Sequence, residues 1–373
     1  MSLPHRIVTA AATAAAVVGL AALPATQALA SSSASYLSNF HKRTTIASTV
    51  PRNGDVNPYG IVVIRHSHGR LHASDILISN FNDKANLQGT GTTIVEISPS
   101  GHRTLFARIH GRLPGACPGG VGLSTALAVL RGGWVVVGST PSKNGSALTA
   151  KAGCLIVLDN KGHVRETISG HGINGPWDMT ALGLGAHEDL FVTNVLNGTV
   201  AAGGKVVHAG SVLRVRLLVH RHRPPQLRGV VRIGSGFAEQ VSASAFVLGP
   251  TGVGLSRSGT LYVASTKTSR IFALPHAINR RTSAGTGRLV SMRRHLSAPL
   301  GLTMAPNGDI LTVNGNNGLI VETTPGGTQV AWKLLDSSGS PKGAGALFGL
   351  TLAPHGRGIY YVDDAVNTLR LLH

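Results

Sequence analysis

Amide and carboxylate side chains recur at turn-forming positions along this chain, and they are the groups that could bind a ligand. Gathered in a ring, they could bind a sugar, a small polar molecule or a cation. They could instead bond neighbouring backbone N–H groups and only shape their own turns. A tryptophan among them could stack on a sugar. The candidate ligand-binding residues are Asn57, Asn80, Asn174, Trp177, Asp178, Asn194, Asn314 and Asp363.

No catalytic motif stands out, so the sequence leaves the catalytic residues unknown. The chain has 17 histidines, which could suggest zinc or copper. His66, His68 and His72 cluster in one expected turn, but we find no cysteine or carboxylate partner at a ligand spacing and expect them to be solvated. His171 precedes a candidate strand near the ligand residues and is the one histidine that we would test as a general base.

The elements that must position these residues follow a repeated phrase, which is clearest in residues 298–327. Three apolar runs, 301–305, 310–313 and 319–324, are separated by turns that are rich in Pro, Asn and Gly. This pattern is typical of short antiparallel strands joined by tight turns. Aligned on this phrase, the chain contains six units, which open at Asn57, Gly120, Gly175, Gly249, Ala298 and Leu347.

Units of this kind bury their apolar faces by packing around a common axis. We therefore predict an all-β fold, a six-bladed β-propeller of four-stranded antiparallel blades. The sixth unit has no fourth strand, and we expect residues 40–48 to supply it and to close the ring. The long interval between Asp178 and Gly252 could hold a degenerate seventh blade. We prefer a long insertion, because residues 211–233 can form the third and fourth strands of the third blade.

This arrangement places the ligand candidates on one face. The loops that lead into the first strands and the loops between the second and third strands lie at the same end of every blade. The candidates therefore surround the mouth of the channel on that face. Phe81, Trp177 and Phe348 lie near the same mouth, where each could stack on a sugar or pack in the core.

The repeated phrase resembles the repeat of the NHL-repeat propellers. The matching segments are residues 250–270, 299–318 and 349–367, and the first three units match in part. The resemblance covers nearly the whole chain after residue 30 and extends to secreted bacterial NHL-type proteins. Such propellers include sensor domains, scaffolds, lactonases and lyases.

The resemblance also bears on metal binding. In lactonase-like members, a Glu and Asn or Asp residues at the strand-one entries hold a divalent metal. The corresponding positions here offer two amides and no carboxylate, which makes a poor site for a hard cation. These positions are Asn57, Gly119, Asn174, Gly249, Ala298 and Ala346.

Residues 1–30 have the pattern of a secretory signal peptide. Arg6 precedes an apolar run over residues 7–23, and Ala28-Leu29-Ala30 is a typical cleavage site. We expect a secreted protein, extracellular or periplasmic, in which residues 31–373 form a single propeller domain. Retention of the segment as an anchor is the alternative. No later run is long enough to span a membrane.

Export would permit a disulfide between the two cysteines. Cys117 lies in the loop that leads into the first strand of the second unit, and Cys154 begins the third strand of that unit. These two points lie at the same end of an up-and-down sheet. We therefore predict a Cys117–Cys154 disulfide, with two free thiols as the alternative.

The formal net charge is +19, with 34 Lys and Arg against 15 Asp and Glu. Such a surface could adsorb to an anionic cell-surface polymer. Most basic residues are scattered, however, and a general compositional bias is the preferred interpretation. Residues 214–223 form the densest basic run. We find no nucleic-acid-binding module and expect no specific nucleic-acid partner.

Together these features favour a monomeric binding or scaffold propeller that presents its channel-mouth loops to a protein, a peptide or a glycan. No cofactor is expected. The alternative is a propeller hydrolase or lyase, similar to the lactonases, with a divalent cation at the mouth. The residues that could hold this cation are Asn80, Asn194, Asn314 and Asp363.

Overall fold

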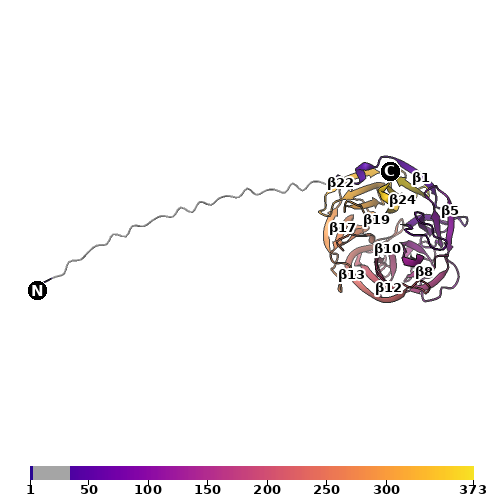
Figure 1. Ribbon diagram of the computed structural model, residues 1–373, viewed down its shortest axis with the longest axis horizontal. Coiled ribbons are helices and arrows are strands. Elements are labelled where there is room, and N and C mark those ends of the chain that lie inside the picture. The colour runs from indigo at the N-terminus through magenta and orange to yellow at the C-terminus, as the bar shows by residue number, and fades with distance from the viewer. Residues whose placement is uncertain (3–33) are drawn as a thin grey trace. The chain divides into compact units, whose positions relative to one another are not determined.

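Six antiparallel sheets surround a common axis in the computed structural model, which describes residues 1–2 and 34–373 (Figure 1). The predicted cleavage site of the signal peptide lies outside the described residues. Five sheets have four strands and one has five, in agreement with the predicted six-bladed propeller. The strands of blades 1 to 5 follow one another in the chain, so that the colours of Figure 1 run around the ring.

The blades are as follows. Blade 1 contains β2 (Val56–Val63), β3 (Ile76–Asn82), β4 (Thr93–Ile97) and β5 (Arg103–Arg108). Blade 2 contains β6 (Leu123–Val129), β7 (Val135–Ser139), β8 (Cys154–Leu158) and β9 (Val164–Ile168). Blade 3 contains β10 (Gly175–Leu184), β11 (His187–Val195), β12 (Val207–Leu218), β13 (Gln226–Ser242) and β14 (Phe246–Leu248).

Blade 4 contains β15 (Pro250–Leu255), β16 (Leu261–Ser265), β17 (Arg270–Leu274) and β18 (Arg288–Met292). Blade 5 contains β19 (Pro299–Met304), β20 (Ile310–Asn314), β21 (Leu319–Thr323) and β22 (Gln329–Leu334). Blade 6 contains β23 (Leu347–Leu352), β24 (Ile359–Asp363), β25 (Thr368–Leu372) and β1 (Arg43–Ser48). A short 3-10 turn, η1 (Leu37–Asn39), precedes β1.

The ring is closed by the two ends of the described chain. Strand β1 pairs antiparallel with β25, from Arg43 opposite Leu372 to Ser48 opposite Thr368. The N-terminal segment thus supplies the fourth strand of the last blade, as predicted. The guanidinium of Arg43 also donates to the backbone carbonyls of Leu334 and Leu335 in blade 5, at 3.0 Å each. Blade 6 is therefore a complete four-stranded sheet, with β1 as its outer edge strand.

The first strands of the blades line the axis, and their glycines let them approach closely. A Cβ atom on Gly252, Gly301 or Gly349 would collide with the backbone of the first strand in the next blade. Only glycine fits where two backbones approach this closely. The glycine of the repeated phrase is therefore a packing requirement of the ring.

Blade 3 confirms the preference for an insertion over a seventh blade. Strands β12 and β13 form a long hairpin, and β13 continues to pair with the short strand β14. The interval between Asp178 and Gly252 is thus taken up by longer strands of one sheet. Within the described part of the chain, no helix is long and apolar enough to cross a membrane.

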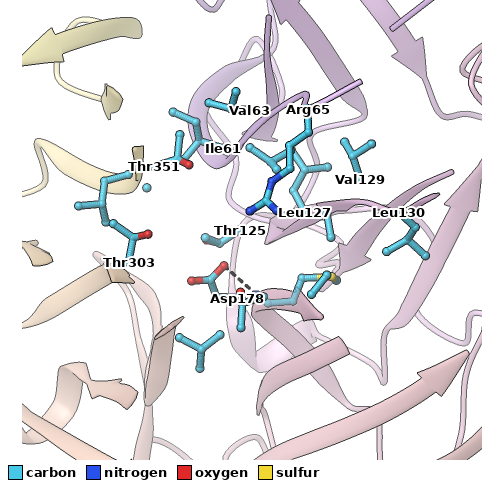
Figure 2. Close-up of a pocket in the computed structure, with 18 of the residues that line it drawn as sticks. Ile61, Val63, Arg65, Thr125, Leu127, Val129, Leu130, Asp178, Thr303 and Thr351 are labelled. Carbon is cyan, nitrogen blue, oxygen red and sulfur yellow. Dashed lines mark hydrogen bonds between the residues drawn. The ribbon is translucent and has the colours of Figure 1, made fainter. Parts of the chain in front are cut away.

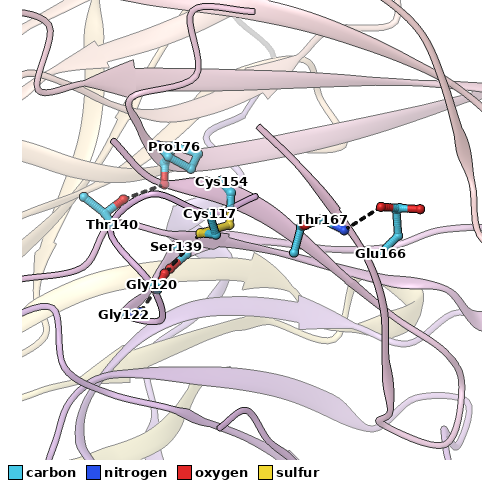
Figure 3. Close-up of a disulfide and its surroundings, with 9 residues drawn as sticks. All are labelled: Cys117, Gly120, Gly122, Ser139, Thr140, Cys154, Glu166, Thr167 and Pro176. Atoms are coloured by element: carbon cyan, nitrogen blue, oxygen red, sulfur yellow. Dashed lines mark hydrogen bonds between the residues drawn. A yellow bond between two sulfur atoms is a disulfide. The ribbon is translucent and has the colours of Figure 1, made fainter. Parts of the chain in front are cut away.

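The predicted disulfide is present in blade 2 (Figure 3). Cys117 and Cys154 have their Cα atoms 5.3 Å apart and are bonded through sulfur. The bond joins the loop that leads into β6 to the first residue of β8. Nearby, Ser139 Oγ donates to the Gly120 carbonyl at 2.8 Å, which fixes the same loop against β7.

Candidate functional site

Aromatic side chains fill the channel at the end where the first strands begin. We call Tyr59, Phe81, Trp177, Phe246 and Phe348 the aromatic plug. Their ring centroids lie 4.2–6.0 Å apart in tilted, edge-to-face and stacked pairs. All five side chains are buried, and Trp177 is only 1% exposed. The core-packing interpretation of Phe81, Trp177 and Phe348 is therefore the one that the structure supports.

The amides at the ends of the second strands were expected to line an open channel mouth, but in the structure they are buried and bond to the backbone. Asn80, Asn194 and Asn314 are fully buried. Each donates from Nδ2 to a backbone carbonyl in the segment that leads into its own blade: Thr49 at 3.2 Å, Gly172 at 2.9 Å and His295 at 2.6 Å. Ser139 makes the equivalent bond to Gly120 in blade 2. We call these four bonds the entry clamps.

Asn57 and Asn174 lie in the entry segments themselves. Asn57 has a positive φ of 59°, which asparagine tolerates better than most residues, and its N–H donates to Asn367 Oδ1 at 2.7 Å. The N–H of Asn174 donates to Asn194 Oδ1 at 2.8 Å. Both residues thus bond to turn and clamp residues. Whether either of them binds a ligand stays a prediction.

The cation site suggested for this face does not fit the geometry. Asp363, the only carboxylate of that set, accepts from Arg370 Nη1 at 2.7 Å and has no exposed surface. The three amides of the set are engaged in entry clamps in three different blades. A hard cation needs several convergent oxygen ligands, which these residues do not present.

A cavity of about 480 Å³ lies beyond the plug, toward the turns that join the first and second strands (Figure 2). This is the face opposite to the one that the sequence suggested. The wall of the cavity combines apolar side chains with polar ones, and more of its surface is polar than apolar. Its apolar residues include Ile61, Val63, Leu127, Val129, Leu302 and Leu350, and the threonines are Thr125, Thr180, Thr303 and Thr351.

Asp178 is the one sequence-predicted ligand residue that lines the cavity (Figure 2). In the strand register, Asp178 follows Trp177 of the aromatic plug and corresponds to a glycine in four other blades. These glycines are Gly60, Gly252, Gly301 and Gly349. The carboxylate of Asp178 accepts the N–H of Met179 at 2.8 Å. Desolvation inside the ring raises the pKa of Asp178 well above its usual value, and the N–H groups of Met179 and Val253 offset this in part.

The backbone at Asp178 is held by a hydroxyl that joins two blades. Thr193 on β11 accepts the N–H of Asp178 at 3.0 Å, and its Oγ1 lies 2.7 Å from the carbonyl of Thr251 on β15. Thr125 stands at the glycine position of blade 2, and its buried hydroxyl has no partner within the described residues. An unpartnered buried hydroxyl that faces a cavity can hydrogen-bond to a ligand or to water.

The rim of the cavity is basic. Arg65 extends from the β2–β3 turn into the cavity (Figure 2), and Arg131 lies on the β6–β7 turn. His66 and His68 line the same rim. The N–H of Arg131 donates to Glu188 Oε1 at 2.7 Å. Desolvation raises the pKa of Glu188, against the effect of this N–H and of the Arg131 charge.

Sequence reasoning missed the threonines and Arg65, and misplaced the start of blade 2. The second unit was aligned on Gly120, but β6 begins at Leu123, which pairs with Ser139 at the end of β7. Between Leu123 and Leu127, β6 has one residue more than the other first strands, so Thr125 and Ala126 together take the place of the glycine. A non-glycine residue at this position, in blades 2 and 3 alone, is the signal that could have identified Thr125 together with Asp178.

Two other groups differ from their expected roles. His72 does have carboxylate neighbours, because Glu96 Oε1 lies 3.0 Å from its Nδ1 and Asp75 Oδ2 lies 4.0 Å from it. The strands bring these groups together across a spacing that the sequence pattern did not suggest. In the basic run 214–223, Arg216 forms a bidentate pair with Asp189 at 2.7 and 2.8 Å, so part of its charge is neutralised. His171 is exposed and does not line the cavity.

No family model and no curated protein matches the chain, so the predicted membership of the NHL-repeat family is not confirmed. Solved structures match over 89% of the chain. One is regucalcin from Agrobacterium tumefaciens, a calcium-binding protein (TM-score 0.54, 13% identity, 93% of that chain covered). A second is a putative gluconolactonase (TM-score 0.52, 14% identity, 91% covered). A third is virginiamycin B lyase from Staphylococcus aureus (TM-score 0.49, 15% identity, 99% covered). At these identities the similarity shows the fold alone.

Proposed function

We propose that this protein binds a small molecule in the axial cavity, which the ligand enters from the face of the turns between the first and second strands. The observation that carries the proposal is the cavity of about 480 Å³ with the carboxyl groups of Asp178 and Glu188 in its wall. Its size is typical of small-molecule sites, and polar groups stand among apolar side chains in its wall. The aromatic plug closes the opposite end, so the ligand meets Asp178 at the bottom.

The wall defines the class of ligand. Desolvation raises the pKa of Asp178 well above its usual value and thus favours the protonated carboxyl group, which can both donate and accept a hydrogen bond. The threonines that line the wall add further polar groups. Arg65 and Arg131 at the rim favour an acidic group on the outer end of the ligand. The fitting ligand is a compact molecule with some apolar surface, a hydrogen-bonding group at one end and an anion at the other.

This proposal keeps the binding role that the sequence favoured and moves the site to the other face. It also retains export as a proposal. The Cys117–Cys154 disulfide is compatible with an extracellular or periplasmic location, where disulfides persist. Binding of a protein, peptide or glycan through the loops of the plugged face remains a separate proposal, as does adsorption to an anionic polymer.

An enzymatic role is the second candidate, and Asp178 is the observation that favours it. A desolvated carboxyl group in a closed channel is suited to general acid or base catalysis. Hydrolysis or elimination on a lactone-like substrate is the class to test, since propellers of this fold include a putative gluconolactonase. Turnover of a lactone that Asp178→Asn abolishes would support the enzyme, whereas binding without turnover supports the first proposal.

The binding proposal can be tested with 8-anilinonaphthalene-1-sulfonate, a fluorescent probe with apolar rings and one anionic group. We expect one probe molecule to bind per chain. Thr303→Trp fills the cavity and should weaken binding at least tenfold. Arg65→Ala removes the cation at the rim and should weaken binding several-fold. Fluorescence titration measures each dissociation constant.

Thr104→Trp is the matched control, because Thr104 is exposed on the outer strand β5. It adds the same indole at a distance from the cavity and should leave binding unchanged. Circular dichroism establishes that each variant is folded. Probe binding that survives the filling of the cavity, in a folded Thr303→Trp variant, would exclude the cavity as the site.

A further inference from the structure

A histidine and two carboxylates converge beside the β2–β3 connection of blade 1, away from the axial cavity. His72 and Asp75 lie in the connection between β2 and β3, and Glu96 lies on β4. One ligand atom from each of the three residues lies within 4.8 Å of the others. Glu96 is 2% exposed, whereas His72 is exposed to solvent. The cluster is thus anchored in the sheet and open on one side.

The carboxylates of this cluster have few hydrogen-bond donors. Glu96 Oε1 accepts the N–H of His72 at 2.8 Å and faces the Nδ1 of the same residue at 3.0 Å. No N–H or O–H group of the described residues donates to Glu96 Oε2 or to either oxygen of Asp75. Desolvation raises the pKa of both carboxyl groups. Two charged carboxylates this close are unfavourable, so the pair either takes up a proton or binds a cation.

Blade 5 contains an acidic pair at the same two positions, but there hydrogen-bond donors surround the carboxylates. Asp309 precedes β20 as Asp75 precedes β3, and Glu322 occupies on β21 the register of Glu96 on β4. There, Asn307 Nδ2 donates to both carboxylates, at 3.1 and 3.0 Å. Glu322 further accepts from Ser35 Oγ, Tyr36 N–H and Leu37 N–H at 2.6–2.8 Å. Blade 1 has His72 where blade 5 has this set of neutral donors.

We propose that His72, Asp75 and Glu96 bind a divalent transition-metal ion of the zinc class. A neutral imidazole with two carboxylate oxygens is a typical three-residue donor set for zinc, with water as the fourth ligand. Ligand atoms of a tetrahedral zinc site lie about 3.3 Å apart, given bonds of about 2.0 Å. The separations of 3.0 and 4.0 Å from His72 Nδ1 bracket this value. The bond from the His72 N–H holds Glu96 in place.

The bound ion would tie the β2–β3 connection to β4. That connection carries Arg65, His66 and His68 on the rim of the axial cavity. The ion therefore stabilises the segment that forms one side of the rim. The site itself does not depend on whether the cavity binds a ligand.

Zinc binding to the untagged full-length protein tests the proposal, with zinc chloride as the probe and isothermal titration calorimetry as the measurement. We expect one equivalent to bind and to raise the melting temperature. Asp75→Asn and His72→Ala should each weaken binding at least tenfold and remove the zinc-induced rise. His72 is exposed, so His72→Ala should retain the melting temperature of the metal-free protein.

Two control variants separate this site from binding by other histidines. His163→Ala removes an exposed histidine whose Nδ1 lies 3.5 Å from a single carboxylate, Asp159. Asp309→Asn removes the corresponding acid of blade 5. Both should leave zinc affinity unchanged. No binding at all, or binding that persists in folded His72→Ala and Asp75→Asn proteins, would overturn the proposal.

Discussion

At the scale of single residues, one position in each first strand, next to the aromatic plug, decides which side chains face the bottom of the cavity. Four blades have glycine there, and a side chain on Gly252, Gly301 or Gly349 would collide with the next blade. Blades 2 and 3 have Thr125 and Asp178 instead, and both line the cavity. The only polar side chains at this level thus come from two neighbouring blades, so the bottom of the cavity is asymmetric.

Asp178 should make stability depend on pH. Its pKa is raised in the folded state, so the folded chain keeps a proton that the unfolded chain loses above about pH 4. The free energy of unfolding therefore falls as pH rises from about 4 through the folded pKa. Asp178→Asn removes this contribution, and its melting temperature should exceed that of the wild type most at high pH. Scanning fluorimetry between pH 4 and 9 measures the difference.

Other carboxyl groups contribute to the same trend, since burial raises the pKa of both Glu239 and Asp364 to about 7. The test therefore compares how the melting temperature of the wild type and of Asp178→Asn changes with pH, since neither is expected to be independent of pH. A variant whose profile runs parallel to that of the wild type at every pH would show that Asp178 is not desolvated.

Residue types alone distinguished poorly between binding and structural roles. Asparagine at the end of a second strand is equally suited to a ligand site and to a turn. The structure shows the second role for Asn80, Asn194 and Asn314, because each bonds a carbonyl of its own entry segment. What could not be predicted was the direction of each amide, which depends on where the entry segment lies in space.

At the scale of elements, the entry clamps join the second strand of a blade to the segment before its first strand. Asn314 Nδ2 contributes bonds to the His295 carbonyl and to Asn317 Oδ1 at 2.6 and 2.9 Å. The Asn314 side chain is fully buried and the bonds are partly buried, so water compensates for their loss only in part. The clamp therefore fixes the position at which each first strand enters the channel.

Asn314→Ala should destabilise the protein by about 1–3 kcal/mol, because it removes a fully buried amide and leaves the His295 carbonyl with only the longer bond from Asn317 Nδ2, at 3.3 Å. Urea unfolding measures the change. Asn316→Ala is the matched control, since Asn316 is exposed in the same turn and should change stability by less than about 0.5 kcal/mol. Equal effects of the two substitutions would argue against the clamp.

The strands themselves were largely predictable, because short β-branched runs between Gly- and Pro-rich turns leave few alternatives. The predicted run 310–313 falls within β20, and Gly308 has the positive φ of 92° that the preceding turn needs. Blade 2 was misaligned because its glycines at 120 and 122 lie in the entry loop and imitate the repeated phrase. The pairing of Leu123 with Ser139 shows the correct register.

At the scale of the whole propeller, the ring depends on the N-terminal segment. Leu37 and Phe40 are buried in a cluster with Leu335 and Tyr361, and β1 completes blade 6. The closure was predictable because the last unit lacked a strand and an unassigned segment preceded the first unit. The open end of the channel was not predictable, because the sizes of side chains from separate strands together decide which end is filled.

A chain that begins at Thr49 should fail to unfold cooperatively, because it lacks β1 and exposes the apolar surface that η1 and β1 cover. Differential scanning calorimetry measures this loss. The control is a chain that begins at Ala34, which retains every described contact of the propeller and should melt like the full-length protein. A truncated chain that melts at the same temperature as this control would show that closure by β1 is dispensable.

The pairing of β1 with β25 also determines when the ring can close during synthesis of the chain. Strand β1 is made before every other strand of the propeller and must wait for its partner β25, which is made after all of them. Until then blade 6 does not exist, and the flanks of blades 1 and 5 that it covers stay bare. The complete ring therefore cannot form before β25 has been made. A late step that joins strands so far apart in the sequence slows folding and prolongs dependence on chaperones.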